Sequence, residues 1–231
     1  MDRNVHIIPT GIDIERFYKE NQDTKKISEI KKHYGIEKGD FVILYVGRLA
    51  KEKNIDFLLD AQRSLVKKNK HYKLMIVGSG PDLEKYKAYT AKHKIANNVI
   101  FTGPIPWENV PYYYNLSTVF VTASKTETQG LTVVEALAAS KPVVCIDDPA
   151  FVSTIIDDLN GKIFKTKRQY CHSIYKLQEE PAVYKRLANQ ALISSEVHSS
   201  KYFAERVLDV YKVAINKKGK KGFFHRIFKG E

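Results

Sequence analysis

The chain has 231 residues, 43% of them hydrophobic, and a formal net charge of +12. This composition excludes an intrinsically disordered chain, and no apolar run approaches the ~20 residues that span a bilayer. The N-terminal sequence MDRNVHIIPTG lacks a secretory-signal pattern, so we expect no export and read Cys145 and Cys171 as reduced thiols of a cytosolic protein.

Seven short segments are rich in Val and Ile and almost continuously apolar, a pattern typical of strands covered on both faces. They are residues 5–9, 41–47, 72–78, 98–103, 118–123, 142–146 and 161–165. Helix-period segments alternate with them at residues 55–68, 82–93, 109–115, 131–140 and 151–157, and others follow at 169–179, 182–196 and 201–216. This alternation predicts βαβ units, so we expect residues 1–216 to form one Rossmann-like α/β domain, a doubly wound, mainly parallel sheet with terminal helices outside it.

Glycines end three of these strand segments, at Gly47, Gly78 and Gly103, and Gly80 follows in GSGPD. Ligands of open parallel sheets bind at the carboxyl edge of the strands. Glycine lets the backbone approach a phosphate closely, although strand-to-helix turns often need glycine in any case. Three glycines in register at one edge favour a binding site.

Two basic residues follow the segment 41–47, in the sequence GRLAKEKN. Arg48 is expected to point into the crevice at the strand end, and Lys53 comes five residues later, before a helix that Asn54 is predicted to cap. A guanidinium fork and a flexible ammonium on one loop suit a diphosphate. The alternative is two solvated side chains among the 38 Lys and Arg residues.

Two glutamates flank the start of the helix predicted at Gly130, Leu131 and Thr132. The free N–H groups of such a helix can receive an anion. Glu127 precedes it in a polar loop, and Glu135 lies one turn inside an otherwise apolar segment. A buried carboxylate is costly unless it is hydrogen-bonded, and sugar hydroxyls would supply those bonds. Alternatively, Glu135 faces water and Glu127 caps a turn.

Other ligand chemistries fit the sequence less well. GSGPDL begins like a dinucleotide-binding G-x-G-x-x-G motif, but Leu83 stands at the third glycine position and the expected acidic residue is missing. No G-K-[ST] sequence indicates a P-loop. His, Cys and Asp spacings typical of metal sites do not occur either, so we expect no metal ion and no cofactor.

The glutamates in TETQGLTVVEALA, with KPVV and NG after them, resemble the E-x7-E retaining glycosyltransferases of the GT-B fold. The sequences VHIIPTGID, GRLAKEKN, VGSGPD and FTGPIP match the same family in the same order. The resemblance covers residues 5–216. It implies that the chain is the C-terminal, donor-binding half of a GT-B architecture, and that an N-terminal acceptor domain would precede it.

The resemblance also implies roles for individual residues. Arg48 and Lys53 would hold the diphosphate of a nucleotide sugar and stabilise its charge as it leaves, Glu127 would contact the sugar, and Glu135 the ribose. Amides of residues 129–132 would lie near the sugar. The donor-binding set is therefore Gly47, Gly78, Gly103, Pro104, Ile105, Gln129, Gly130, Leu131, Thr132 and Glu135, of which residues 103–106 would line the base.

The chain departs from the family pattern at Ser140, where glycine is common, and in residues 147–153, which lack the usual Gly-Gly and Pro-Glu. Within the family, TETQGLT is most similar to bacterial enzymes that transfer glucose from UDP-glucose to diacylglycerol, because Phe or Tyr commonly takes the place of Gln129 elsewhere. Alternatives are a transferase for cell-surface polysaccharide and a nucleotide-sugar-binding module without turnover.

Residues 217–231 form a basic tail, with six Lys and Arg residues against one Glu. On a helix its aromatic residues would fall on one face, a composition suited to an anionic membrane surface. The residues expected to contact the membrane are Lys220, Lys221, Phe223, Phe224, Arg226, Ile227 and Phe228. The alternatives are packing on another domain or disorder of the tail. We therefore expect a peripheral protein on the cytoplasmic face of the cell membrane, and no nucleic-acid partner.

Overall fold

A computed structural model of the chain describes the backbone of residues 5–229 and the side chains of residues 5–215. The chain divides into two compact units. One comprises Ile14–Ser195, and the other comprises Met1–Asp13 together with Glu196–Glu231.

A parallel sheet of six strands forms the centre of the unit Ile14–Ser195, in the order β3-β2-β1-β4-β5-β6. In register, β1 pairs Ile43 with Leu74 of β2 on one side and with Val119 of β4 on the other. Each strand arises from a predicted apolar segment, so the doubly wound α/β prediction is confirmed. The strands are β1 (Phe41–Val46), β2 (Tyr72–Val77), β3 (Val99–Gly103), β4 (Val119–Thr122), β5 (Val143–Ile146) and β6 (Gly161–Phe164).

One of the seven predicted strands, at residues 5–9, does not form. The described sheet does not include it, and the side chains of Val5 and Ile7 are 82% and 85% exposed. The first ladder contact comes at Ile12, whose N–H donates to the His198 carbonyl at 3.0 Å and whose carbonyl accepts from the Ser200 N–H at 2.8 Å. Val and Ile favour a strand only where a neighbouring strand supplies partners.

Most predicted helices form within a few residues of their expected bounds, and α2 matches its expected range. The α-helices are α1 (Thr24–His33), α2 (Ile55–Lys68), α3 (Leu83–Lys92), α4 (Val110–Leu116), α5 (Leu131–Ala138), α6 (Lys167–Glu179), α7 (Pro181–Ser195) and α8 (Ser200–Lys229). Short 3-10 helices are η1 (Ile14–Phe17), η2 (Lys19–Asn21), η3 (Lys51–Lys53), η4 (Ala96–Asn98), η5 (Trp107–Asn109) and η6 (Glu196–His198).

The prediction of a helix at residues 151–157 is wrong, because side chains in and beside this segment form hydrogen bonds with backbone groups that a helix would need. The Asp148 carboxylate accepts from the Ala150 N–H at 3.0 Å. The Asn160 amide accepts from the Ile156 N–H at 2.9 Å and donates to the Thr154 carbonyl at 2.9 Å. Such side-chain bonds favour turns over helix, and the segment is a string of turns.

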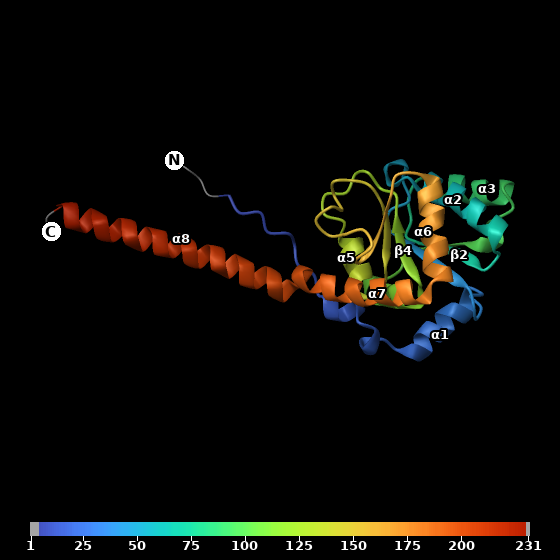
Figure 1. Cartoon of the computed structure of the whole chain (residues 1–231), viewed down its shortest axis with the longest axis horizontal. Helices are drawn as coiled ribbons and strands as arrows, with labels where there is room; N and C mark the ends of the chain where they lie inside the picture. The colour runs from blue at the N-terminus through green and yellow to red at the C-terminus, as the bar shows by residue number, and fades with distance from the viewer. Residues whose placement is uncertain (1–4, 230–231) are drawn as a thin grey trace. The chain divides into compact units, whose positions relative to one another are not determined.

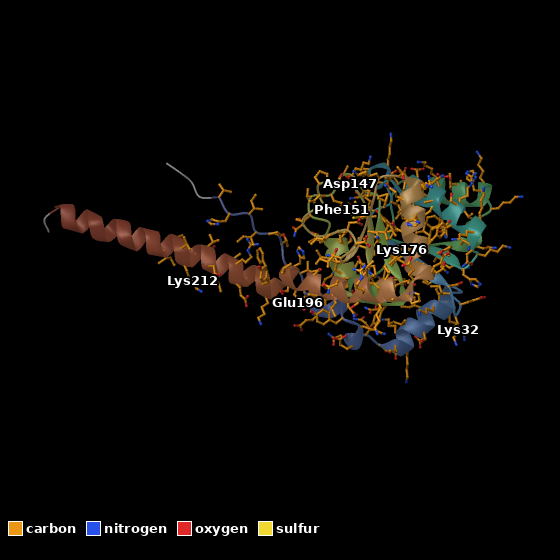
Figure 2. All side chains as sticks on the ribbon, viewed as in Figure 1. Lys32, Asp147, Phe151, Lys176, Glu196 and Lys212 are labelled. Carbon is orange, nitrogen blue, oxygen red and sulfur yellow. The ribbon has the colours of Figure 1, made fainter. Side chains whose placement is uncertain are left out.

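The helices cover the sheet in two layers. Helix α2 contacts both α3 and α6, and α4 contacts both α1 and α5. Figure 1 shows β4 between α5 and α6. Side chains of the central strands, such as Ile43 and Leu44, are fully buried. The outer surface of the unit carries many long polar side chains, with Lys32 and Lys176 as labelled examples (Figure 2).

In the second unit, α8 extends the predicted helix 201–216 as far as Lys229. The backbone near Gly11 lies close to this helix, because a Cβ at Gly11 would come within 2.6 Å of the Phe203 Cβ. Within residues 5–229, no helix is both long and apolar enough to cross a bilayer.

Gly80 shows why the loops at the carboxyl edge need glycine. The loop after β2 crosses the loop after β1, where the Leu49 N–H donates to the Ser79 carbonyl at 2.9 Å and the Asp82 N–H donates to the Leu49 carbonyl at 3.1 Å. A Cβ on Gly80 would lie 2.7 Å from the Leu49 amide nitrogen and closer still to its carbonyl oxygen. The absence of a side chain at Gly80 therefore allows the two loops to cross in contact.

Gly80→Ala is expected to lower the free energy of unfolding by about 1–3 kcal/mol, because main-chain atoms must move to admit the methyl group. Chemical denaturation measures the change. Gly35→Asn is the control, since Gly35 has a left-handed φ of 62° that asparagine tolerates and open space around it. Its effect should stay within about 0.5 kcal/mol. Equal unfolding free energies for Gly80→Ala and the unmodified chain would contradict the crossing role.

Candidate functional site

The parallel sheet brings the predicted site residues to one edge. The loops after β1, β2, β3 and β4 all leave the carboxyl ends of their strands. The strand order reverses between β1 and β4, so these two neighbours lead their helices in opposite directions. In open α/β sheets, a crevice at such a switch point is the usual ligand site.

A pocket of about 280 Å³ lies at the ends of the first three strands. It contains five of the predicted residues, and Arg48 contributes an exposed side chain with no ion-pair partner among the described residues. Gly103 joins this region by accepting a hydrogen bond at its carbonyl from the Gly78 N–H at 2.9 Å. The lining residues are Val46, Gly47, Arg48, Val77, Gly78, Ser79, Pro104, Ile105 and Val110.

Close approach of two loops explains Gly78, as it does Gly80. Gly78 has a φ of 132°, and a Cβ there would collide with the carbonyl oxygen of Gly47. The hydroxyl of buried Tyr45 lies beside the same turn and donates to the Arg48 carbonyl at 3.1 Å. A buried side chain of β1 therefore restrains the main chain at Arg48.

Lys53 and Glu127 meet across the switch point. Lys53 ends η3, which follows β1, and Glu127 lies in the loop after β4. The Lys53 Nζ lies 2.6 Å from the Glu127 Oε1, and the two side chains are 20% and 26% exposed. An ammonium offers three donors, so this pair leaves donors on Lys53 for another anion.

Asn54 connects the same two loops, but in a different way from the prediction. It occupies the residue before α2, in a left-handed conformation with φ 54°, yet its side chain makes no capping hydrogen bond. Instead, its Nδ2 donates to the carbonyl of Ala123, just after β4, at 3.3 Å. The amide thus ties the β1 loop to the β4 loop beside the ion pair.

Helix α5 begins with a tight turn at Gly130. Gly130 adopts φ 62°, and a Cβ there would come within 2.9 Å of the Phe151 ring. Phe151, labelled in Figure 2, belongs to the turns between β5 and β6. The first N–H groups of a helix have no partner within it, so Leu131 and Thr132 present theirs at the carboxyl edge. Gln129 precedes this turn.

Glu135 is half-buried inside α5 and is hydrogen-bonded, as its apolar context predicts. The donor is the hydroxyl of Tyr114, 2.7 Å from the Glu135 Oε2. Burial raises the pKa of Glu135, while the Tyr114 hydrogen bond and the positive charge of Arg16 act in the opposite direction. Among the described residues, no hydrogen bond or ion pair joins Glu135 directly to Arg48, Lys53 or Glu127.

Sequence reasoning missed the partners that hold the site. Tyr114 falls in the helix predicted at residues 109–115, and that prediction gives it no role in the site. Arg16 stacks on the Trp107 ring, with its guanidinium carbon 3.2 Å from the ring centroid, and donates to the Trp107 carbonyl at 3.3 Å. No sequence pattern marks which of the three tyrosine hydroxyls in PYYYN reaches Glu135.

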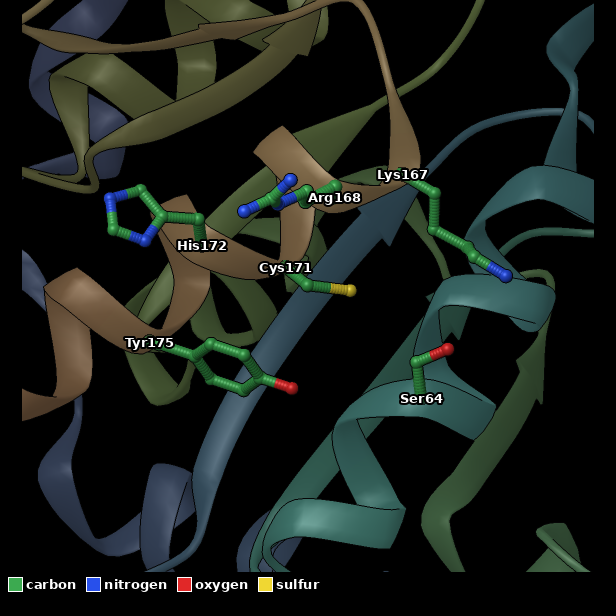
Figure 3. A pocket seen from close by; sticks show the side chains of 6 residues that line it. All are labelled: Ser64, Lys167, Arg168, Cys171, His172 and Tyr175. Carbon is green, nitrogen blue, oxygen red and sulfur yellow. The ribbon is translucent and has the colours of Figure 1, made fainter.

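A second pocket, of about 370 Å³, lies between α2 and α6 and contains none of the residues predicted to bind the donor (Figure 3). One of its basic residues, Lys167, is paired with Asp60 at 2.6 Å. The described residues hold no group of three or more His, Cys, Asp or Glu side chains placed to bind a metal ion. The pocket is lined by Ser64, Lys167, Arg168, Cys171, His172 and Tyr175.

The predicted membrane contacts, Lys220, Lys221, Phe223, Phe224, Arg226, Ile227 and Phe228, have side chains outside the described part of the structure. Their backbone lies in α8. The orientation of this face therefore stays a prediction.

Solved structures of similar fold include HepE of Anabaena in complex with UDP, which matches 90% of this chain and 57% of its own with a TM-score of 0.81 at 18% identity. WaaG, a glycosyltransferase involved in lipopolysaccharide biosynthesis, matches 89% of this chain and 55% of its own with a TM-score of 0.75 at 20% identity. These likenesses establish the Rossmann-like domain of GT-B glycosyltransferases as the fold.

Curated relatives include two alpha-monoglucosyldiacylglycerol synthases. The one from Acholeplasma laidlawii is 32% identical over 220 residues, which are 95% of this chain and 55% of the relative. The one from Streptococcus pneumoniae is 30% identical over 211 residues, which are 90% of this chain and 47% of the relative. The chain thus spans about half the length of these relatives.

The family described as "Glycosyl transferases group 1" matches residues 26–193, which include every predicted donor-binding residue. The sequence identity to the two synthases and the GT-B fold agree with this match. The chain belongs to the group 1 glycosyl transferases.

Proposed function

We propose that this chain is the donor-binding part of a retaining glycosyltransferase that moves glucose from UDP-glucose to a membrane lipid such as diacylglycerol. The observation that carries the proposal is the Lys53–Glu127 pair at the β1–β4 switch point, 2.6 Å between Nζ and Oε1, in a group 1 glycosyl transferase. The names of the two synthase relatives support the choice of sugar and acceptor.

The basic residues of the β1 loop would receive the diphosphate. Arg48 is exposed at the pocket formed by the first three strand ends, and Lys53 retains donors beyond its bond to Glu127. Two positive groups held at fixed positions stabilise the negative charge that grows on the leaving diphosphate. The Tyr45 hydroxyl and the Asn54 amide hold the loop, so little reorganisation is needed when charge develops.

The carboxylates would grip hydroxyl groups on either side of that charge. Glu127 is paired with Lys53, which would also bind the diphosphate. Glu127 would therefore lie next to the end of the diphosphate to which the sugar is attached. Glu135 is one turn into α5 and, in this arrangement, receives the ribose hydroxyls. The N–H groups at the start of α5 add partial positive charge toward the donor. Pro104 and Ile105 supply the apolar wall for the base.

The acceptor lipid would bind to groups that this chain does not provide. The two synthase relatives are about twice as long as the matched region, which leaves room for an acceptor-binding domain. The basic tail at residues 217–231 would keep the enzyme at an anionic membrane surface on the cytoplasmic side, where the lipid is available.

Arg48→Ala is expected to weaken UDP binding about 10- to 100-fold, because it removes a charge-assisted hydrogen bond. Calorimetric titration with a panel of nucleotide sugars measures this and identifies the base and sugar; UDP-glucose should bind best, and NAD should not bind. Arg63→Ala is the control, since Arg63 is on α2 and pairs only weakly with Asp60 at 3.7 Å. An unchanged UDP affinity in Arg48→Ala would remove Arg48 from the site.

Glu127→Gln should reduce the affinity for UDP-glucose more than the affinity for UDP, because only UDP-glucose has a sugar that loses a carboxylate partner. Loss of the Lys53–Glu127 ion pair acts on the diphosphate, which both ligands share, and so cancels in the comparison. The ratio of the two dissociation constants, measured on one protein preparation, isolates the sugar contribution. Glu52→Gln removes the same charge from an exposed position in η3 and should leave the ratio unchanged. If Glu127→Gln leaves it unchanged too, Glu127 does not contact the sugar.

Deletion of residues 217–231 should abolish flotation with phosphatidylglycerol vesicles and spare UDP binding, since each basic residue contributes about 1 kcal/mol at an anionic surface. Vesicles of phosphatidylcholine are the neutral control. A variant with the tail lysines changed to glutamine separates charge from the apolar side chains. Equal flotation of the full chain and the deletion variant would exclude the tail as the anchor.

A further inference from the structure

Tyr114 is completely buried, and its hydroxyl is hydrogen-bonded to Glu135. Its hydroxyl oxygen is 2.7 Å from the Glu135 Oε2 and 3.2 Å from the Thr132 carbonyl oxygen. Both partners belong to the first turns of α5, whereas Tyr114 comes from α4. One hydroxyl therefore contacts the start of α5 and its single acidic side chain.

The ring of Tyr114 is held by aromatic neighbours on two sides. Phe17 of η1 meets it edge-on, with ring centroids 5.5 Å apart, and Phe120 of β4 lies 5.7 Å away. Packed aromatic rings leave few rotamers available, so the hydroxyl position is fixed by the core. Burial also raises the pKa of Tyr114 well above its ordinary value, so the phenol keeps its proton and acts as a donor.

A tyrosine hydroxyl has one proton, and two acceptors compete for it here. The shorter contact is to the carboxylate, and hydrogen bonds to ionised acceptors are the stronger ones. The proton therefore goes to the Glu135 Oε2. This bond restrains an otherwise rotatable carboxylate and leaves Oε1 to accept from a ligand.

We propose that Tyr114 is a positioning residue for donor binding, whose hydroxyl orients the Glu135 carboxylate toward the two ribose hydroxyls. This inference rests on the proposed function, because it assigns Glu135 to the nucleoside of the donor. Tyr114 itself would not touch the donor, since its side chain is completely buried.

Two groups lower the pKa of Glu135 against the effect of burial, the Tyr114 hydroxyl from α4 and the Arg16 guanidinium from η1. Loss of the Tyr114 hydroxyl removes one of the two influences that lower the pKa of Glu135, so that pKa should rise further. The carboxylate accepts ribose hydrogen bonds in its ionised form. Affinity should therefore fall at a higher pH in Tyr114→Phe than in the unmodified chain as the solution is acidified.

The test compares UDP binding to the full chain and to Tyr114→Phe by calorimetry, with an expected loss of about tenfold at neutral pH. Tyr184→Phe is the matched control. It also removes a tyrosine hydroxyl bonded to a main-chain carbonyl, that of Thr118 at 3.1 Å, but at the amino end of β4, away from the site. Its UDP affinity should equal that of the unmodified chain.

Two further readouts separate positioning from a purely structural role. In a Glu135→Ala background, Tyr114→Phe should cause no additional loss of UDP affinity. The ratio of affinities between Tyr114→Phe and the unmodified chain, in which the ionisation of UDP itself cancels, should widen as the pH is lowered from 8 to about 5, near ordinary carboxyl pKa values.

The outcomes distinguish the inference from the function on which it rests. If the unmodified chain and Tyr184→Phe bind UDP and Tyr114→Phe binds it equally well, the positioning role is wrong and the donor-binding function stands. A loss in Tyr114→Phe that persists in the Glu135→Ala background, or that does not change with pH, also overturns it. If the unmodified chain binds no UDP, the proposed function fails and this inference fails with it.

Discussion

The parallel pairing of β1 with β4 is the constraint on which the rest of the structure depends. These strands are neighbours in the sheet although β2 and β3 lie between them in sequence. Their register, Ile43 with Val119 and Leu44 with Phe120, places the loop that bears Arg48 and Lys53 beside the loop that bears Glu127. The Lys53–Glu127 bond is a consequence of this pairing, and the Asn54 side chain reinforces it from the next residue.

Buried tyrosines link the polar groups of the site to the apolar core, because their rings pack in the core and their hydroxyls bond to the site. Tyr45 and Tyr114 are both buried. The Tyr45 hydroxyl donates to the Arg48 carbonyl, and the Tyr114 hydroxyl donates to the Glu135 carboxylate. Burying a hydroxyl is tolerable only when it is hydrogen-bonded. These bonds satisfy the tyrosines and, at the same time, fix the groups that the donor would contact.

Glycines at the carboxyl edge have a structural role that precedes any ligand. Gly78 and Gly80 let the loop after β2 lie directly on the loop after β1, where a side chain would meet main-chain atoms. Gly130 makes room for Phe151 and supplies the left-handed turn before α5. The close packing of these loops produces a preorganised edge, which is the property that electrostatic catalysis requires.

Local sequence patterns determined the strands, most helices and the edge on which Arg48, Lys53, Glu127 and Glu135 lie, because burial leaves a periodic trace in the chain. Only the tertiary structure decided which groups touch. Lys53 and Glu127 are 74 residues apart, and the Tyr114 hydroxyl reaches Glu135 from another helix. The failures at residues 5–9 and 151–157 have the same origin: one apolar segment found no neighbouring strand, and side chains of Asp148 and Asn160 displaced a helix. Periodicity reports how deeply a residue is buried, whereas partners depend on which distant segments the sheet brings together.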